Sequence, residues 1–498
     1  MTEPRPLIVV SLPARTPEEA APQIAAAAAA GADAAELRLD RWSSEDRARV
    51  GSVFPAALPL LATLRSTAEG GEGPDAPADR AEAFRAIARH PFRWIDLERA
   101  RDDAVAGSLP PIARVGRVVS AHLARYDPDG WPKLWLELAR HDGIGKLVLP
   151  ASVPAVLDEI VPTIAGRRPG PVIVHTLGPS GPLLRALARR LALPMVFAAL
   201  PESAGAGTVE PSQLPVDRLR PFLDAEGEPP LFAVAGRPIG HSQSPAVHSD
   251  WMRRDGRDGL YLPLEFEDDD EFLRSIPLLA ANGFRGLNVT QPFKSAAFEG
   301  ATDARASAEL CRAANCLVLR EDEVVAENTD LAAIVRRLEE LRRDGRWTGR
   351  SVTVLGTGGA ARASLAAARE LGAVAQVVGR RPSAAERIAE EFGARAVRAG
   401  DAAPTELLVN ATSVGRDASG APELPLAALL APSATVLDWV YRPERADVAD
   451  AARAAGASYE DGWRLFVYQA AASYALFWGQ PPSDKAIAAT ISEGSCAA

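Results

Sequence analysis

Cysteine is scarce in this chain of 498 residues, and three kinds of segment are missing from it. The three cysteines, Cys311, Cys316 and Cys496, are too few and too poorly spaced for a disulfide framework or a zinc site. No apolar run approaches the roughly 20 residues of a membrane span. The first residues lack the basic start and the apolar core of a signal peptide. These absences predict a protein of the reducing cytoplasm that holds no metal and has no membrane partner.

Long basic stretches are missing as well, and the net charge is −10. This balance argues against nucleic acid or an anionic membrane surface as the main partner. The hydrophobic fraction of 47% and the charged fraction of 24% are typical of globular proteins. We therefore expect a small anionic substrate that individual arginines bind. At about 150 residues per domain, the length suggests more than one domain.

Lysine is the scarcest basic residue, with only Lys133, Lys146, Lys294 and Lys485 present. Arginine carries surface charge as well as lysine does, but it keeps its proton near neutral pH and cannot form a Schiff base. In a chain this rich in arginine, we expect lysine to persist where chemistry requires it. Lys146, in a short apolar run, and Lys294 are the two candidates. Lys133 and Lys485 lie in polar helical stretches, where lysine needs no special role.

Short apolar runs alternate with helical segments up to about residue 215. Eight such runs begin at Leu7, Ala35, Leu60, Trp94, Arg117, Lys146, Val172 and Met195. Eight βα units of this size are typical of a (β/α)8 TIM barrel. The polar, proline-rich stretch from Asp224 to Pro230 then interrupts the alternation and indicates an interdomain linker.

A glycine turn follows the apolar run that begins at Ser351. It contains Gly356, Gly358, Gly359 and Ala360, and a helix is expected to start there. Such a turn lets a pyrophosphate approach backbone N–H groups at a helix N-terminus. Because the expected helix lies between two expected strands, as in dinucleotide-binding folds, the turn favours a dinucleotide site.

The residues after the next expected strand bear on the choice of cofactor. A site specific for NAD would carry an acidic residue there, whereas this chain has Arg380 and Arg381. Two cations suit a 2′-phosphate, which favours NADP.

Charged residues stand near the ends of the expected barrel strands, where barrel enzymes assemble their active sites. They are Glu36, Arg38, Arg65, Glu69, His122, Lys146 and Arg185. Burial should lower the pKa of Lys146 and make its amine nucleophilic. His122 has a pKa suited to moving protons near neutral pH. A metal-dependent aldolase-type barrel remains an alternative for this set.

The same residues resemble type I 3-dehydroquinate dehydratase over roughly residues 7–215. The resemblance rests on the runs 36–40, 63–66, 69–71 and 120–122, with Lys146. It implies that Lys146 forms an imine with the substrate ketone and that His122, oriented by Glu69, moves the proton. It further implies that the substrate is held by Glu36, Arg38, Arg65, Arg185 and Ser203. The chain departs from the family in having Leu123 and Ala124 after the histidine, and no proline-glycine-glutamine directly after Ser203, so we expect the glutamine contact to be absent.

A second ordered set of polar residues follows the linker. It comprises Ser242, Ser244, Thr290, Lys294, Asn315, Asp330, Tyr441 and Gln469. Two hydroxyls one residue apart can both point at one carboxylate. Lys294 and Asp330, if they meet in a cleft, would form a proton-transfer pair.

This order resembles shikimate dehydrogenase over residues 231–490. The resemblance implies that Ser242 and Ser244 bind the substrate carboxylate and that Lys294 and Asp330 transfer the proton. It places the remaining polar residues near the ring hydroxyls, and NADP on the glycine turn with Arg380, Arg381, Asn410 and Thr412. Two small departures are Glu327, where the family has glycine, and Gly379, where it has asparagine.

Together the resemblances imply a cytoplasmic bifunctional enzyme, monomeric or homodimeric, that converts 3-dehydroquinate to 3-dehydroshikimate and reduces it to shikimate with NADPH. The expected domains are a barrel over residues 1–222, a linker over 223–230, a substrate-binding domain over 231–335 completed by 463–498, and a Rossmann domain over 336–462. One alternative is a dehydrogenase acting on quinate or shikimate. In that case the barrel would be catalytically impaired and would serve as a scaffold or a metabolite-binding module.

Overall fold

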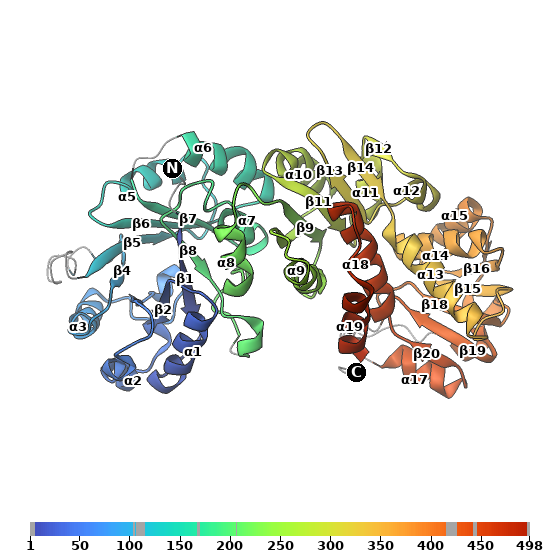
Figure 1. Cartoon of the computed structure of the whole chain (residues 1–498), viewed down its shortest axis with the longest axis horizontal. Helices are drawn as coiled ribbons and strands as arrows, with labels where there is room; N and C mark the ends of the chain where they lie inside the picture. The colour runs from blue at the N-terminus through green and yellow to red at the C-terminus, as the bar shows by residue number, and fades with distance from the viewer. Residues whose placement is uncertain are drawn as a thin grey trace. The chain divides into compact units, whose positions relative to one another are not determined.

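Eight parallel strands form the first sheet of the computed structural model (Figure 1). They are β1 (Leu7–Leu12), β2 (Ala34–Arg38), β3 (Leu60–Thr63), β4 (Trp94–Glu98), β5 (Gly116–His122), β6 (Ile144–Pro150), β7 (Val172–Leu177) and β8 (Met195–Ala198). Their order is β7-β6-β5-β4-β3-β2-β1-β8, so β7 and β8 are the two ends of a nearly closed barrel. The predicted barrel is confirmed, with one strand at each of the eight apolar runs.

The structure describes residues 5–102, 105, 115–166, 170–205, 207–414, 426–441 and 446–495. By their internal contacts the residues group into two compact units, Met1–Leu231 with Asp258–Gly283 and Phe232–Arg257 with Phe284–Ala498. None of the helices within the described ranges combines the length and the apolar character needed to cross a membrane.

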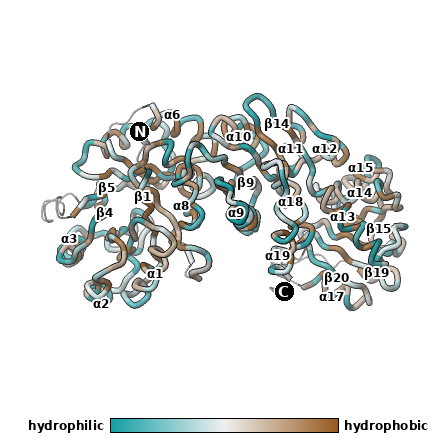
Figure 2. The backbone as a smooth tube through the Cα atoms, viewed as in Figure 1, coloured by the Kyte–Doolittle hydropathy of each residue, from teal (hydrophilic) through white to brown (hydrophobic). Residues whose placement is uncertain are grey.

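Helices follow the barrel strands. They are α1 (Pro17–Ala29), α2 (Ser44–Ala48), α3 (Pro77–Ile87), α5 (Trp131–Leu138), α6 (Val161–Gly166), α7 (Gly181–Ala186) and α8 (Val216–Asp224). The first of them begins where Thr16 accepts a hydrogen bond from the backbone of Glu19 and Pro17 stands at the first helical position. Figure 2 shows β1 as hydrophobic, whereas hydrophilic and hydrophobic residues alternate along α3, as expected for an inner strand and for an outer helix with one buried face.

The barrel interior is filled by buried side chains that come from its strands. Val9, Ala34, Leu61, Trp94, Val118, Ile173, Met195 and Phe197 form one cluster. Because this layer is packed, the space for chemistry lies at the carboxyl ends of the strands.

The second sheet is mixed. Its strands are β9 (Leu231–Gly236), β10 (Leu260–Glu265), β11 (Phe284–Val289), β12 (Asp303–Ala304), β13 (Cys316–Leu319) and β14 (Val324–Glu327), in the order β10-β9-β11-β13-β14-β12. Strand β13 runs antiparallel to both β11 and β14. The helices of this part are α9 (Ser244–Arg254), α10 (Asp269–Ala281), α11 (Lys294–Glu299), α12 (Ala306–Cys311) and α13 (Thr329–Arg343).

The third sheet is parallel in every described strand pair. Its strands are β15 (Ser351–Leu355), β16 (Val374–Val378), β17 (Arg395–Ala396), β18 (Thr405–Asn410), β19 (Leu430–Asp438) and β20 (Ser458–Glu460). The order β17-β16-β15-β18-β19-β20 reverses direction between β15 and β18, which is the arrangement of dinucleotide-binding folds. The predicted Rossmann fold is therefore confirmed.

The helices of this last region are α14 (Gly359–Glu370), α15 (Pro382–Phe392), α16 (Leu426–Leu429), α17 (Asp447–Ala454), α18 (Trp463–Trp478) and α19 (Asp484–Ser495). Helix α18 packs against α13 and also contacts β11 and β13. The end of the chain thus returns to the second sheet, as Figure 1 shows in red beside the yellow elements.

Candidate active sites

Lys146 projects from β6 into a cluster of charged residues at the carboxyl end of the barrel. Its Nζ donates a hydrogen bond to Asp96 Oδ2 at 3.1 Å and lies 3.8 Å from Glu36 Oε1. The amine also lies 3.9 Å from the centroid of the Phe197 ring. The lysine side chain is only 7% exposed, so its amine meets these groups with little solvent between them.

Asp96 is a residue that sequence reasoning missed. It lies in β4 together with Glu98, and both side chains are buried. Two acidic residues at alternate positions of an apolar strand face the same side of the sheet. This spacing is the sequence pattern that could have identified Asp96 as a site residue. Burial alone would raise the pKa of Asp96, but the cations of Arg65 and Lys146 outweigh it and hold that pKa well below its usual range.

Arg65 joins three carboxylates, two from β4 and one from the segment after β3. Its guanidinium lies 2.9 Å from Asp96, 3.0 Å from Glu69 and 3.3 Å from Glu98. The arginine side chain is 4% exposed, and a buried charge is stable only when it is paired in this way. Arg65 therefore fixes the positions of the acidic groups around Lys146.

His122, at the end of β5, is paired with Glu69. Its Nδ1 lies 3.1 Å from Glu69 Oε2. Burial raises the pKa of Glu69 to about 7, against the opposing charge of Arg65. Burial, together with the cations of Arg65 and Lys146, lowers the pKa of His122 well below its ordinary value. At neutral pH the imidazole is therefore neutral, which is the form that can accept a proton.

Glu36 links the lysine to a loop that follows β8. Its carboxylate accepts hydrogen bonds from Ser11 at 2.6 Å and from Thr63 at 2.7 Å. Ser11 in turn accepts a bond from Gln213 Nε2 at 3.0 Å. Arg38, beside them on β2, pairs through two nitrogens with Asp40 at 2.8–2.9 Å.

The sequence predicts no glutamine from this loop at the site, and the structure corrects that prediction. The residues directly after Ser203 contain none, but Gln213 reaches the site from further along the same loop. Its Oε1 is buried and has no hydrogen-bond partner among the described residues, so an acceptor is left for another donor. The side chain of Ser203 lies outside the described residues.

Arg185 stands apart from the lysine cluster, at the seam between β7 and β8. It donates hydrogen bonds to the carbonyls of Thr176 in β7 at 3.2 Å and Phe197 in β8 at 3.0 Å. Its Nη2 lies 3.4 Å from Glu210 Oε2. Burial lowers the pKa of Arg185 to about 10, so the side chain stays charged at neutral pH. In the described part of the sheet, β7 and β8 form no strand pairing with each other, and the Arg185 side chain supplies hydrogen bonds to both.

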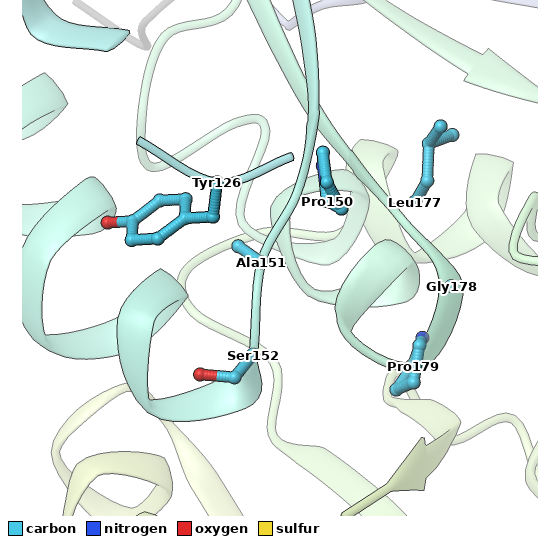
Figure 3. Close-up of a pocket in the computed structure, with 7 residues that line it drawn as sticks. All are labelled: Tyr126, Pro150, Ala151, Ser152, Leu177, Gly178 and Pro179. Atoms are coloured by element: carbon cyan, nitrogen blue, oxygen red, sulfur yellow. The ribbon is translucent and has the colours of Figure 1, made fainter. Parts of the chain in front are cut away.

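An apolar pocket of about 450 Å³ lies at the ends of β6 and β7 (Figure 3). Pro150, Leu177 and Tyr126, from the segment after β5, are among its lining residues. The Tyr126 hydroxyl is bound to Glu159 at 2.7 Å and points away from Leu177 in Figure 3. None of the predicted site residues lines this pocket, and it offers no convergent charged groups.

A pocket of about 470 Å³ in the second unit brings together all eight residues of the second predicted set. They are Ser242, Ser244, Thr290, Lys294, Asn315, Asp330, Tyr441 and Gln469. The pocket also contains Asn288, Trp439 and Phe466, of which the last two are aromatic residues that sequence reasoning did not single out. The Tyr441 ring packs against Phe466 at a tilt of 37°, with 4.7 Å between the ring centroids.

Lys294 and Asp330 form the ionic pair of this pocket. Lys294 begins α11, and its Nζ donates to Asp330 Oδ2 at 2.5 Å. Asp330 lies in the first turn of α13, where Asn328 caps the helix by accepting a bond from Leu331 at 3.1 Å. Asn315 donates to the other oxygen of Asp330 at 2.9 Å. Both carboxylate oxygens are therefore held in place.

The glycine turn lies between β15 and α14. Gly356 has φ +109°, and a Cβ there would lie 2.7 Å from the carbonyl oxygen of Ala411. Gly358 precedes the helix, and nothing lies within 4 Å of the Cβ position it lacks. The turn therefore leaves room for an anionic group at the N-terminus of α14, which fits a dinucleotide pyrophosphate.

One glycine of the turn contacts the ionic pair. A Cβ on Gly359 would lie 2.6 Å from Cδ of Lys294, so the lysine stem packs directly on this glycine. Ala360, the next residue, lines the pocket with Lys294 and Asp330. The cofactor turn and the proposed proton-transfer pair are thus parts of one wall.

The other predicted cofactor residues lie at the carboxyl ends of neighbouring strands. Arg380 and Arg381 follow β16 and are exposed. Asn410 ends β18; its side chain accepts from Thr412 Oγ1 at 2.7 Å and donates to Asp438 at 2.8 Å. Nowhere in the described ranges do three or more His, Cys, Asp or Glu side chains gather so that they could hold a metal ion.

Comparison with known proteins divides the chain at the end of the predicted linker, between residues 229 and 234. Residues 8–229 match the family described as type I 3-dehydroquinase. Residues 234–317 match the shikimate dehydrogenase substrate binding domain.

Several relatives match the second half of the chain. A shikimate dehydrogenase (NADP(+)) of Acidiphilium cryptum is 37% identical over 261 residues, which covers 51% of this chain and 93% of the relative. That of Caulobacter vibrioides is 37% identical over 260 residues, covering 51% of this chain and 90% of the relative.

Solved structures resemble the chain to different extents. Shikimate 5-dehydrogenase from Thermus thermophilus, in complex with NADP(H) and shikimate, has 32% identity and a TM-score of 0.48, covering 53% of this chain and 99% of its own. Dehydroquinate dehydratase and shikimate dehydrogenase from S. pombe AroM has 21% identity and a TM-score of 0.43, covering 98% of both chains. On the family matches and the relatives, the chain belongs to the shikimate dehydrogenase family and carries a type I 3-dehydroquinase region ahead of its dehydrogenase region.

Proposed function

We propose that the chain catalyses two consecutive reactions of the shikimate pathway. The barrel dehydrates 3-dehydroquinate to 3-dehydroshikimate, and the second unit reduces this ketone to shikimate with NADPH. The family matches of the two halves support both activities. The observation that carries the first is the buried amine of Lys146, held beside Asp96 and Glu36 at the carboxyl end of the barrel.

In the dehydration, Lys146 Nζ attacks the substrate ketone, and loss of water leaves an iminium ion. His122 removes the proton from the neighbouring carbon, and the electron pair of the broken C–H bond moves toward the iminium nitrogen. The hydroxyl group on the next carbon then leaves with a proton returned by His122, and hydrolysis of the imine releases the product and the lysine. The neutral state of His122 and its contact with Glu69 at 3.1 Å suit this role.

Arg65 and Arg38 are proposed to bind the oxygens of the substrate ring, while Arg185 binds the substrate carboxylate and Gln213 binds at the β8 side of the site. Arg65 is the best placed of these, because it already orients Asp96 and Glu69 around the amine. A site that is assembled before substrate arrives loses little free energy to reorganisation during the reaction.

Trapping of the imine tests the first activity. Borohydride added with 3-dehydroquinate should attach the reduced adduct to the peptide that contains Lys146, and Lys146→Arg should abolish both adduct and dehydration while leaving reduction of 3-dehydroshikimate intact. Lys133→Arg is the matched control, because this lysine lies exposed on α5. Dehydration that persists in Lys146→Arg would contradict the proposal.

In the reduction, Lys294 donates a proton to the oxygen of the substrate ketone as negative charge develops there. Asp330 holds the ammonium in position, and Asn315 fixes the carboxylate through its other oxygen. NADPH, when bound on the glycine turn, supplies the hydride. Ser242 and Ser244, at the start of α9, are proposed to bind the substrate carboxylate, with Thr290, Tyr441 and Gln469 near the ring hydroxyls.

The domain boundaries proposed for this function are 1–222 for the barrel, 223–230 for the linker, 231–335 with 463–498 for the substrate-binding domain, and 336–462 for the Rossmann domain. The end of α8 at Asp224 and the start of β9 at Leu231 support the linker. We further propose a cytoplasmic monomer or homodimer. The free thiols of Cys311 and Cys316, both buried, suit a reducing compartment.

A further inference from the structure

Arg185 has little capacity left for a substrate. Its Nε and Nη1 donate to carbonyls of Phe197, Thr176 and Gly181, and Nη1 also lies 3.3 Å from Ser212 Oγ. The bonds to Thr176 and Phe197 join β7 to β8, and breaking them would open the seam of the barrel. Nη2 is therefore the nitrogen through which this arginine can bind an anion.

Glu210 already occupies that nitrogen. Its Oε2 lies 3.4 Å from Arg185 Nη2, which is longer than the roughly 2.7–2.9 Å of a strong charge-assisted hydrogen bond. The glutamate side chain is 25% exposed, whereas the arginine is 2% exposed. The carboxylate thus approaches from the solvent side and is weakly held by the arginine.

The turn that carries Glu210 also carries Gln213. The backbone N–H of Gln213 donates to the carbonyl of Glu210 at 3.1 Å, and Oε2 of Glu210 accepts from the backbone of Ser212 at 3.1 Å. At its far end the turn is attached to the barrel through Ala199, which donates to Leu214 at 2.9 Å. A change in the position of the Glu210 side chain therefore acts on the turn that presents Gln213 to Ser11.

We infer that Glu210 is an internal competitor for the substrate carboxylate at Arg185 and thereby sets the KM of the dehydration. This inference depends on the proposed function, in which Arg185 binds that carboxylate. The substrate takes the place of Glu210 on Nη2, and the glutamate moves toward solvent. Two carboxylates next to one guanidinium repel each other, so binding is weaker than it would be with an uncharged residue in the turn.

Glu210→Gln tests the inference, because it removes the charge and keeps the size. The KM for 3-dehydroquinate should fall about threefold to fivefold, as expected for loss of one partly exposed charge interaction, with kcat unchanged. The Tm without ligand should decrease, since Arg185 loses its anionic partner, and the rise in Tm on adding 3-dehydroquinate should be larger than in the wild type. Glu202→Gln is the control: this glutamate is in the same loop, pairs with Arg218 and is 69% exposed.

A lower Tm together with an unchanged or higher KM would overturn the inference, because Glu210 would then serve only as a charge partner of Arg185. Should Glu210→Gln fail to fold, Glu210→Asp keeps the charge on a shorter side chain and should lower KM in the same direction; an unchanged KM would overturn the inference here too. A wild-type chain without dehydration would overturn the proposed function as well. Normal dehydration in the wild type with no change in either variant would overturn the inference alone.

Discussion

Replacing Glu69 by glutamine should make the barrel more stable at alkaline pH and less active. Burial raises the pKa of Glu69 from an ordinary value of 4.5 to about 7. The folded state therefore binds more protons than the unfolded state between about pH 4.5 and 7, and the free energy of unfolding decreases as pH rises through this window. Glutamine has no charge to bury, so Glu69→Gln removes this loss of stability.

The magnitude follows from the two pKa values. Their difference, 7 − 4.5 = 2.5, at about 1.4 kcal/mol per pH unit, corresponds to about 3 kcal/mol. The Glu69 side chain is 9% exposed, so solvent screens this effect little. At pH 8 the variant should therefore exceed the wild type by about 3 kcal/mol in free energy of unfolding, and at pH 4.5 the two should be nearly equal. Dehydration should fall because His122 loses its charged partner.

Urea unfolding at pH 4.5 and pH 8 would measure the difference, with pulsed hydrogen exchange of peptides from β3 to β6 so that the barrel is observed separately. Glu72→Gln is the control, because this glutamate lies in the same loop, is half exposed and has its pKa lowered by a hydrogen bond from Arg15. A stability gain that is the same at both pH values, or a variant less stable than the wild type at pH 8, would refute the reasoning.

Two further predictions concern the second unit. Lys294→Ala should lower kcat for reduction by about a hundredfold or more, because the proton donor is lost. The KM for NADPH should change little, because the cofactor turn is kept. Steady-state kinetics with an unchanged kcat and a raised KM for NADPH would contradict this prediction. Arg380→Glu should raise the KM for NADPH by about tenfold or more, since a charged hydrogen bond is replaced by repulsion, and should leave the KM for NADH nearly unchanged. Arg343→Glu, exposed at the end of α13, is its control, and equal effects on both cofactors would show that Arg380 does not contact the 2′-phosphate.

The architecture was largely predictable because it rests on local patterns. Each barrel strand is a short apolar run, and the glycine turn before α14 marks the nucleotide-binding fold through its own backbone requirements. The pocket around Lys294 was also predictable, since the residues that line it occur in short motifs of recognisable order.

Other parts of the sites depend on contacts that sequence spacing does not reveal. Asp96 is one of two acidic residues in β4, and its role is visible only when Arg65 and Lys146 are both beside it. Gln213 reaches Ser11 only because the loop after β8 folds back over the barrel end. The involvement of Arg185 with backbone carbonyls depends on how β7 and β8 approach each other, which no local pattern encodes.

The contact between Gly359 and the stem of Lys294 limits where cofactor preference can be altered. A methyl group at this glycine would meet the lysine at 2.6 Å, so even the smallest enlargement moves the amine relative to Asp330. Attempts to redesign the nucleotide site should leave this position untouched and act on Arg380 and Arg381, which lie exposed after a different strand. Evolution of a new coenzyme choice in this scaffold would face the same restriction.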